Sequence, residues 1–174
     1  MTVILAAAVI WVSLPDASKR EVPPDVACDL PEPKGPVLLE ISVRGGQDGQ
    51  GHHIAMDRAA LDALPQEGFR TRTLWTDGEQ VFRGVRLKTM MRCLGIEDGT
   101  LTLHARNAYV IEIAARDVRS DGALIATQRN GAAMSVRDKG PLWLVYPYDG
   151  NPAFRTESIY AQSIWQLDRI EIAP

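Results

Sequence analysis

The stretch Arg137 to Gly150, RDKGPLWLVYPYDG, is the part of the sequence that says most about the fold. Leu142 to Tyr146 is an unbroken apolar run that starts after a Gly-Pro pair and ends before Pro147. A short run with Val, Trp and Tyr in it is typical of a strand buried on both faces. We therefore expect this strand at the centre of the core. Polar residues flank it, so we expect any ligand to bind where the strand meets the surface.

The length of the chain indicates the number of domains, and its charge argues against one class of partner. A chain of 174 residues suits one domain, because a domain of this size buries roughly 70% of its unfolded surface. The 19 basic and 22 acidic residues give a net charge of -3. This balance lacks the cationic excess that phosphate backbones select, which argues against nucleic acid as a partner.

Residues 1–18 are predicted to be a signal peptide. Their apolar block, MTVILAAAVIWVSL, is shorter than the about 20 residues of a membrane span. It resembles the hydrophobic region of a secretory signal, although no Lys or Arg precedes it. A buried N-terminal strand or helix is the alternative. We expect export to a bacterial periplasm and no stable membrane span.

A proline-rich tether is expected over residues 19–36, followed by a domain over residues 37–174. Frequent Pro among charged residues excludes a helix or a central strand in the tether. Cys28 lies in the tether and Cys93 in the domain. The two thiols of an exported protein could join. Cys93, however, lies on the apolar face of a predicted helix, where an inert buried thiol is common, and we favour that interpretation.

Hydrophobic patterns in the domain predict about nine strands and two or three short helices. The expected strands are residues 37–43, 52–56, 71–75, 80–83, 100–104, 108–114, 123–128, 142–146 and 163–172, the last with a bend near Asp168. Asp57 is expected to cap a first helix, and a firmer helix is expected in VRLKTMMRCLG, residues 85–95. Asn130-Gly131 predicts a hairpin turn. The fold class is therefore α+β, as a β-rich mixed α/β single domain with short connections.

The sequence lacks the familiar catalytic and metal-binding motifs. His52 and His53 would point to opposite faces of a strand, and His104 has no partner at ligand spacing. A G-x-S-x-G elbow, a C-x-x-C pair and an H-E-x-x-H helix do not occur. The glycine-rich residues 45–51 lack the Lys of a P-loop and are better interpreted as a hairpin tip. No catalytic or metal-ligating residue is predicted.

A set of cationic and aromatic residues remains as a candidate binding site. They fall at predicted strand ends or turns, where side chains can converge, and they are Arg106, Tyr109, Arg129, Arg137, Lys139, Tyr148 and Arg155. Arg suits phosphate or carboxylate through its planar fork of donors. Each residue alone could equally be a solvated surface group. As a group they predict a site for an anion.

Four blocks of sequence, in this order, resemble the molybdopterin-binding domain of the sulfite oxidase superfamily. The blocks are FRGVRLKTMMRCLGI (82–96), ARNAYVIEIAARDV (105–118), LIATQRNGAAMSVRDKGPLWLVYPYD (124–149) and SIWQLDRIEI (163–172). The residues that carry the resemblance are Gly84, Val85 and Leu87, then Asn107, Ala108 and Tyr109, then Asn130 and Gly131, then Gly140, Pro141 and Leu142. The resemblance implies that fold over residues 37–172, in the small stand-alone bacterial branch.

The resemblance fails at the metal ligand. Catalytic members hold molybdenum through a cysteine thiolate on the segment before the G-V-x-L helix. The corresponding segment here, TRTLWTDGEQVFRGV, contains no cysteine, and Trp75 or Thr76 stands near the expected place. Neither side chain can replace a soft thiolate. The resemblance therefore implies a former cofactor cleft without its metal ligand, with Trp75 as one wall.

These observations lead to one favoured function and two alternatives. The favoured function is an exported, non-catalytic module, a pseudoenzyme without a cofactor. Its former cofactor cleft would bind a small anionic ligand or a periplasmic or membrane protein partner. The first alternative is a molybdopterin-dependent oxidoreductase with atypical metal ligation, in which the same arginines bind the pterin phosphate. A purely structural interaction domain is the second.

Overall fold

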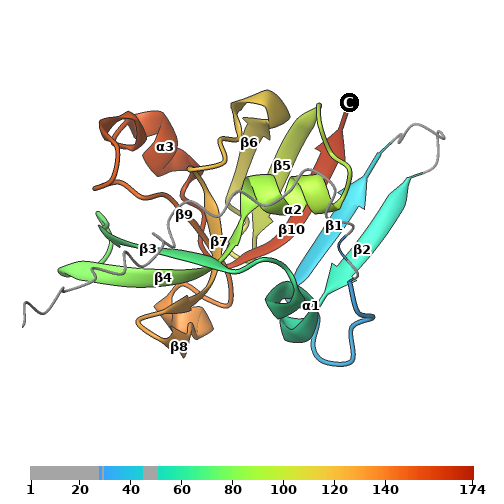
Figure 1. The fold of residues 1–174 in the computed structure, drawn as a ribbon, viewed down its shortest axis with the longest axis horizontal. Coiled ribbons are helices and arrows are strands. Elements are labelled where there is room, and N and C mark those ends of the chain that lie inside the picture. The colour runs from blue at the N-terminus through green and yellow to red at the C-terminus, as the bar shows by residue number, and fades with distance from the viewer. Residues whose placement is uncertain (1–27, 29, 45–50) are drawn as a thin grey trace, which may run out of the picture.

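The computed structural model describes Cys28, residues 30–44 and residues 51–174 (Figure 1). The predicted signal peptide, the first part of the tether and the tip of the first predicted hairpin lie outside these residues. The described part forms one sheet-rich α+β domain with ten strands and three α-helices. No helix among the described residues is long and apolar enough to cross a membrane.

The first sheet, sheet A, holds five of the described strands in the order β2-β1-β10-β5-β6. They are β1 (Leu39–Val43), β2 (His52–Met56), β5 (Thr100–Ala105), β6 (Val110–Ala114) and β10 (Leu167–Ala173). β1 and β10 are parallel and the other neighbours are antiparallel. Alternate residues such as Ile41, Leu103 and Ile170 are buried on one face. A register shift between Leu167 and Arg169 confirms the predicted bend in the last strand.

The second sheet, sheet B, holds the other five described strands. They are β3 (Glu67–Arg72), β4 (Glu79–Arg86), β7 (Leu124–Arg129), β8 (Ala132–Ala133) and β9 (Trp143–Val145), with β9 paired to β7 beside the path β3-β4-β7-β8. The prediction of a fully buried strand is confirmed, since every residue of β9 is 0% exposed. The predicted strand over 71–75 is wrong in position. β3 ends at Arg72, and the Thr73 hydroxyl then accepts the Trp75 N–H at 3.1 Å, which closes a turn.

Short helices cover the ends and one face of the sheets. α1 (Arg58–Ala63) begins as predicted, because Asp57 accepts the N–H of Ala60 at 2.9 Å. α2 (Leu87–Cys93) lies across the face of sheet A (Figure 1), where Leu87 and Met91 pack with Ile170. α3 (Glu157–Gln162), which was not predicted, is held at its start by Thr156.

One glycine is required where the two central strands of sheet B meet. Gly84 lies at a register shift between β4 and β7. A Cβ there would collide with the carbonyl oxygen of Ile125 and would come within 2.9 Å of the Ala126 Cα. Any larger residue must push the strands apart, so Gly84 permits the close pairing that carries β4 directly into α2.

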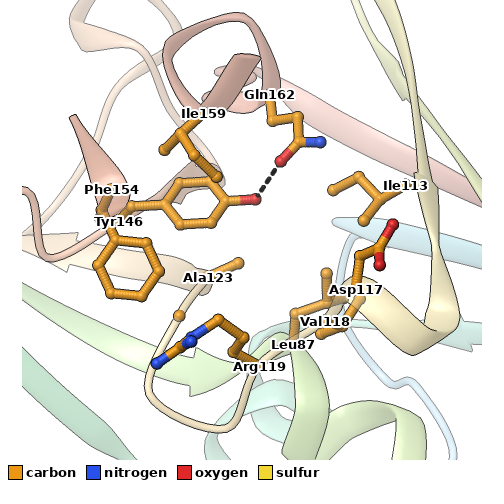
Figure 2. Close-up of a pocket in the computed structure, with 11 residues that line it drawn as sticks. Leu87, Ile113, Asp117, Val118, Arg119, Ala123, Tyr146, Phe154, Ile159 and Gln162 are labelled. Atoms are coloured by element: carbon orange, nitrogen blue, oxygen red, sulfur yellow. Dashed lines mark hydrogen bonds between the residues drawn. The ribbon is translucent and has the colours of Figure 1, made fainter. Parts of the chain in front are cut away.

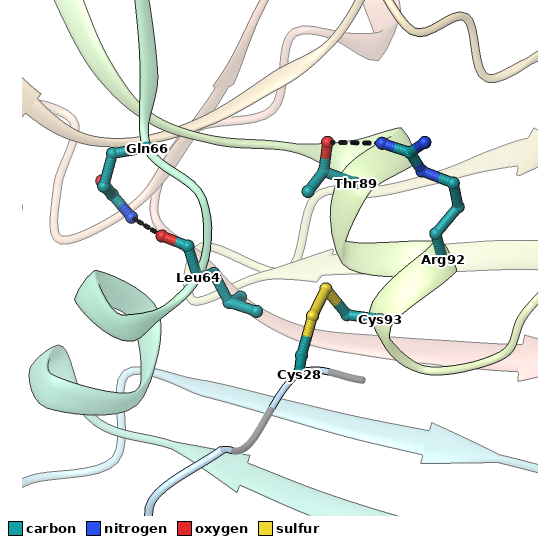
Figure 3. The surroundings of a disulfide bond; sticks show 6 residues. All are labelled: Cys28, Leu64, Gln66, Thr89, Arg92 and Cys93. Carbon is teal, nitrogen blue, oxygen red and sulfur yellow. Dashed lines mark hydrogen bonds between the residues drawn. A yellow bond between two sulfur atoms is a disulfide. The ribbon is translucent and has the colours of Figure 1, made fainter. Parts of the chain in front are cut away.

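The favoured interpretation of the cysteines is wrong, because Cys28 and Cys93 form a disulfide (Figure 3). Cys93 lies at the last turn of α2 and is only half-buried, so its thiol can reach the preceding segment. That segment is also attached beyond the disulfide. The N–H groups of Lys34 and Gly35 donate to the Asp57 carboxylate at 2.9 and 2.8 Å. The last part of the predicted tether is therefore packed on the domain.

Candidate functional site

An open depression with a volume of about 360 Å³ lies at one end of sheet B. It is bordered by the turn between β3 and β4, by the end of β7 and by the 3-10 turn Val136–Asp138. We call it the cationic depression, and its lining residues are Trp75, Thr76, Asp77, Gln80, Arg129, Arg137, Asp138 and Lys139. Its volume lies in the range of roughly 300 to 1,000 Å³ that is common for small-molecule sites.

The Asn130-Gly131 turn positions Arg129. Both turn residues have positive φ, 53° and 80°, as the predicted hairpin requires. The Asn130 side chain also ties the turn to β4, because its oxygen accepts the Val81 N–H at 2.9 Å and its amide donates to Gln80 at 2.9 Å. Arg129 therefore leaves a backbone that is fixed on both sides.

A second rigid turn positions Arg137 and Lys139. Ser135 caps it, since its hydroxyl donates to the Asp138 carboxylate at 2.8 Å and accepts the Asp138 N–H at 3.2 Å. Lys139 then adopts a left-handed conformation with φ 72°. A Cβ on Gly140 would collide with the Met134 carbonyl, so the chain passes too close here for any other residue.

An aromatic cluster supports the depression from below. The half-buried ring of Trp75 makes edge contacts with Trp143, Tyr148, Tyr160 and Trp165, with ring centres 5.7 to 6.4 Å apart. The Lys139 ammonium lies 4.9 Å from the centre of the Trp165 ring and 5.8 Å from that of Trp143. Such cation–π contacts hold a charge above apolar rings. The aromatic cluster therefore holds the Trp75 ring and the Lys139 ammonium against the same two rings, those of Trp143 and Trp165.

Within the described part of the chain, the arginines of the depression have no acidic partner. Among the described residues, no carboxylate lies within 4.0 Å of a guanidinium nitrogen of Arg129 or Arg137. Eight other arginines of the described residues form ion pairs, although Arg83 and Arg116, like Arg129 and Arg137, do not. Arg86, for example, donates to Glu67 at 3.0 Å and to the Gly122 carbonyl at 2.6 Å. The two guanidinium groups thus remain available to an anion.

The structure brings together half of the predicted site residues: Trp75, Arg129, Arg137 and Lys139. Two others lie in the turn between β5 and β6. Arg106 is 3.8 Å from Asp168 and lines a separate depression of about 180 Å³. Tyr109 donates its hydroxyl to the Ala161 carbonyl at 2.9 Å. Arg106 and Tyr109 therefore do not line the cationic depression.

Tyr148 and Arg155 are structural residues. Tyr148 is only 2% exposed, and its hydroxyl shares a hydrogen bond of 2.5 Å with Ser163. Burial raises the pKa of Tyr148 above the usual value of a phenol, so the hydroxyl stays protonated at neutral pH. Arg155 donates to the Tyr148 carbonyl at 2.7 Å and so fixes the chain after β9. Neither residue lines the depression.

The prediction missed four lining residues: Thr76, Asp77, Gln80 and Asp138. Sequence signals did lie close to them. The Asp77-Gly78 pair marks a turn directly after Trp75, and Asp138 lies between Arg137 and Lys139. Two turns that each bear one acidic side chain were therefore visible in the sequence, but their proximity in space was not.

A smaller crevice lies between α3, β6 and the chain after β9 (Figure 2). Tyr146 donates its hydroxyl to Gln162 at 2.9 Å on one side, and Asp117 and Arg119 lie on the other. Burial raises the pKa of Tyr146, which keeps this phenol protonated. The volume of about 30 Å³ has room for one or two water molecules, which is too small for an organic ligand.

The described residues contain no group of three or more His, Cys, Asp or Glu side chains that could hold a metal ion. A comparison with models of known protein families finds no match, and none of the curated proteins matches the chain.

Proposed function

We propose that the protein is an exported binding module that holds a small anionic ligand in the cationic depression. One observation carries this proposal. Arg129, Arg137 and Lys139 come from two separate turns onto one open depression beside Trp75, and the arginines have no carboxylate partner among the described residues. Exposed cations normally gain little from surface contacts. Arg129 and Arg137 are held on rigid turns without a carboxylate partner among the described residues, so their guanidinium groups contribute little to stability and are available to a ligand.

The resemblance to the sulfite oxidase superfamily supports the place of this site. In that resemblance, the segment around Trp75 faces the cofactor cleft, and Trp75 lines the depression. The donor atoms, however, do not fit a molybdenum centre held by a thiolate. The chain has two cysteines, which are joined to each other, and the Trp75 segment offers an indole, a hydroxyl and a carboxylate. The proposed module is therefore non-catalytic and works without this cofactor.

Export is supported by two independent features. The apolar block at residues 1–14 resembles a secretory signal. The disulfide between Cys28 and Cys93 is typical of proteins that mature in an oxidising compartment such as the periplasm. Fractionation of cells that express the full chain tests this part of the proposal, and a reduced protein that stays with the cytosol would contradict it.

Thermal unfolding in the presence of small anions tests the binding function. Phosphate, sulfate, small carboxylates and a pterin should be compared, because a ligand that binds only the folded state raises Tm, and the rise grows with the ratio of its concentration to Kd. We expect at least one anion to raise Tm, and we expect Arg137→Ala to abolish that rise. Arg116→Ala is the matched control, since Arg116 is exposed but lies outside the depression. Equal responses of both variants would contradict the proposed site.

A further inference from the structure

The cationic depression carries negative charge as well as positive. Asp77 and Asp138 line it together with the three cations, which leaves a formal charge of +1 from the three cations and two carboxylates. The net charge is therefore small, and the arrangement of the charges matters more than their sum.

The opposite charges in this depression are not paired with one another. No cation among the described residues lies within 4.0 Å of the Asp77 or Asp138 carboxylate oxygens. The Asp138 carboxylate accepts the Ser135 hydroxyl instead, which holds it in place. Lys139 lies against the rings of Trp143 and Trp165, and none of the described carboxylates is within 4.0 Å of its ammonium. Both kinds of charge therefore line one depression without an ion pair between them.

From this arrangement we infer that the ligand is amphoteric: a small molecule with one anionic group and one ammonium group. Its anion would contact Arg129 and Arg137, and its ammonium would contact the carboxylates of Asp77 and Asp138. This inference rests on the proposed function and narrows the ligand class. A plain anion would be repelled by both carboxylates, whereas an amphoteric ligand gains from both sets of charges.

The rigid turns support selection by charge position. The Ser135 cap fixes the Asp138 carboxylate, and the Asn130 side chain fixes the turn that follows Arg129, before any ligand arrives. Preorganised groups lose little conformational entropy on binding, so small ligands benefit most. The open shape of the depression gives a small polar molecule direct access from solvent.

Matched pairs of probes test the inference. Ethanesulfonate and taurine share a sulfonate, and propionate and β-alanine share a carboxylate, but only taurine and β-alanine carry an ammonium group. Calorimetric titration of the full mature chain should show each ammonium-bearing probe binding about fivefold more tightly than its partner. This factor corresponds to one ion pair at about 4 Å in water.

Variants of the acidic residues make the test specific. Asp77→Asn and Asp138→Asn should weaken binding of taurine and strengthen binding of ethanesulfonate, because each removes one negative charge. Asn at position 138 can still accept the Ser135 hydroxyl, and near-ultraviolet circular dichroism checks that the variants are folded. Glu79→Gln is the control, since Glu79 is paired with Arg70 at 3.4 Å and lies outside the depression.

The outcomes separate the two levels of the proposal. A preference for ammonium-bearing probes that is reduced in the aspartate variants supports the inference. If all four probes bind with equal affinity and the aspartate variants bind each of them more tightly, the inference is overturned while anion binding stands. If no probe or inorganic anion binds, both the inference and the proposed function are overturned.

Discussion

Removal of the disulfide should destabilise the domain strongly without changing its fold. Cys28 and Cys93 are 65 residues apart in sequence, and their Cα atoms are 5.2 Å apart. Closing a loop of this length removes entropy from the unfolded chain, which corresponds to about 4 kcal/mol of stability at 25 °C. The estimate is an upper bound, because loss of the disulfide also frees the end of the native chain.

The native structure limits that fraying. Lys34 and Gly35 remain bound to Asp57 when the disulfide is absent, so only the residues before them gain freedom. We therefore expect the double variant Cys28→Ser, Cys93→Ser to lose about 2 to 3 kcal/mol of unfolding free energy. Its denaturant m-value should rise, because an unfolded chain without the cross-link exposes more surface.

Equilibrium unfolding in guanidinium chloride measures both quantities. Wild-type protein with reductant should unfold like the double variant, whereas reductant should leave the variant unchanged. A loss of less than about 0.5 kcal/mol, with an unchanged m-value, would refute the reasoning. It would show that the cross-link restricts the unfolded chain far less than its loop length predicts.

Three further substitutions test how the domain is held together. Asp57→Asn should destabilise most above about pH 4. The N–H groups of Ala60 and Gly35 lower the pKa of Asp57, so its stabilising effect is lost only as the pH falls through that lowered pKa. Thermal unfolding from pH 3 to 7 should show that the difference in stability between variant and wild type shrinks in acid. A difference that stays constant with pH would argue against this account. Arg86→Met should lower the free energy of unfolding by about 2 to 3 kcal/mol, because the nearly buried Arg86 side chain loses its hydrogen bonds to the Glu67 carboxylate and the Gly122 carbonyl, while Glu67 keeps access to water. Urea unfolding measures this loss, and a change within experimental error would contradict it. Gly84→Ala should lower the free energy of unfolding by about 2 to 4 kcal/mol, because the new Cβ collides with Ile125. Gly78→Ala should lower it by about 1 kcal/mol, because positive φ is the only obstacle there. Similar losses in the two variants would contradict the close approach of the strands at Gly84.

Local patterns predicted much of the fold. The apolar run before Pro147 indicated the buried strand β9, and the Asp57 cap and the Asn130-Gly131 turn were both confirmed. Each of these depends on interactions between residues close in sequence. The parallel pairing of β1 with β10 could not be predicted in the same way, because it joins the two ends of the domain and has no local signal.

The disulfide and the shifted strand β3 show the same limit. Whether Cys93 pairs depends on where the segment before β1 runs, and the helical pattern around Cys93 contains no information about that. β3 was placed too late because Thr71 to Trp75 alternates as a strand would. Instead, the Thr73 hydroxyl accepts the Trp75 N–H and closes a turn, which places the Trp75 ring in the aromatic cluster.

The candidate site was predicted in part for a related reason. Arg129, Arg137 and Lys139 lie on turns whose sequence signals are strong, and these turns meet in space. Tyr109 falls within the predicted strand over residues 108–114, where the alternation places it on one side with Ile111 and Ile113. Ala108, however, adopts a positive φ of 65°, so β6 begins only at Val110 and Tyr109 lies outside the strand alternation, 46% exposed. Residue type and strand ends therefore indicated an anion site, while the backbone conformation decided which side chains share it.

The central claim, that an anion binds in the cationic depression, is tested most directly by an NMR titration that resolves the tryptophan indoles. Trp75 lines the depression, whereas Trp143 is fully buried beneath it. With phosphate or taurine as titrant, we predict saturable shifts of the Trp75 indole and of the Arg129 and Arg137 side-chain signals. Absence of saturable shifts, or saturable shifts confined to the region of Arg106, would contradict the claim.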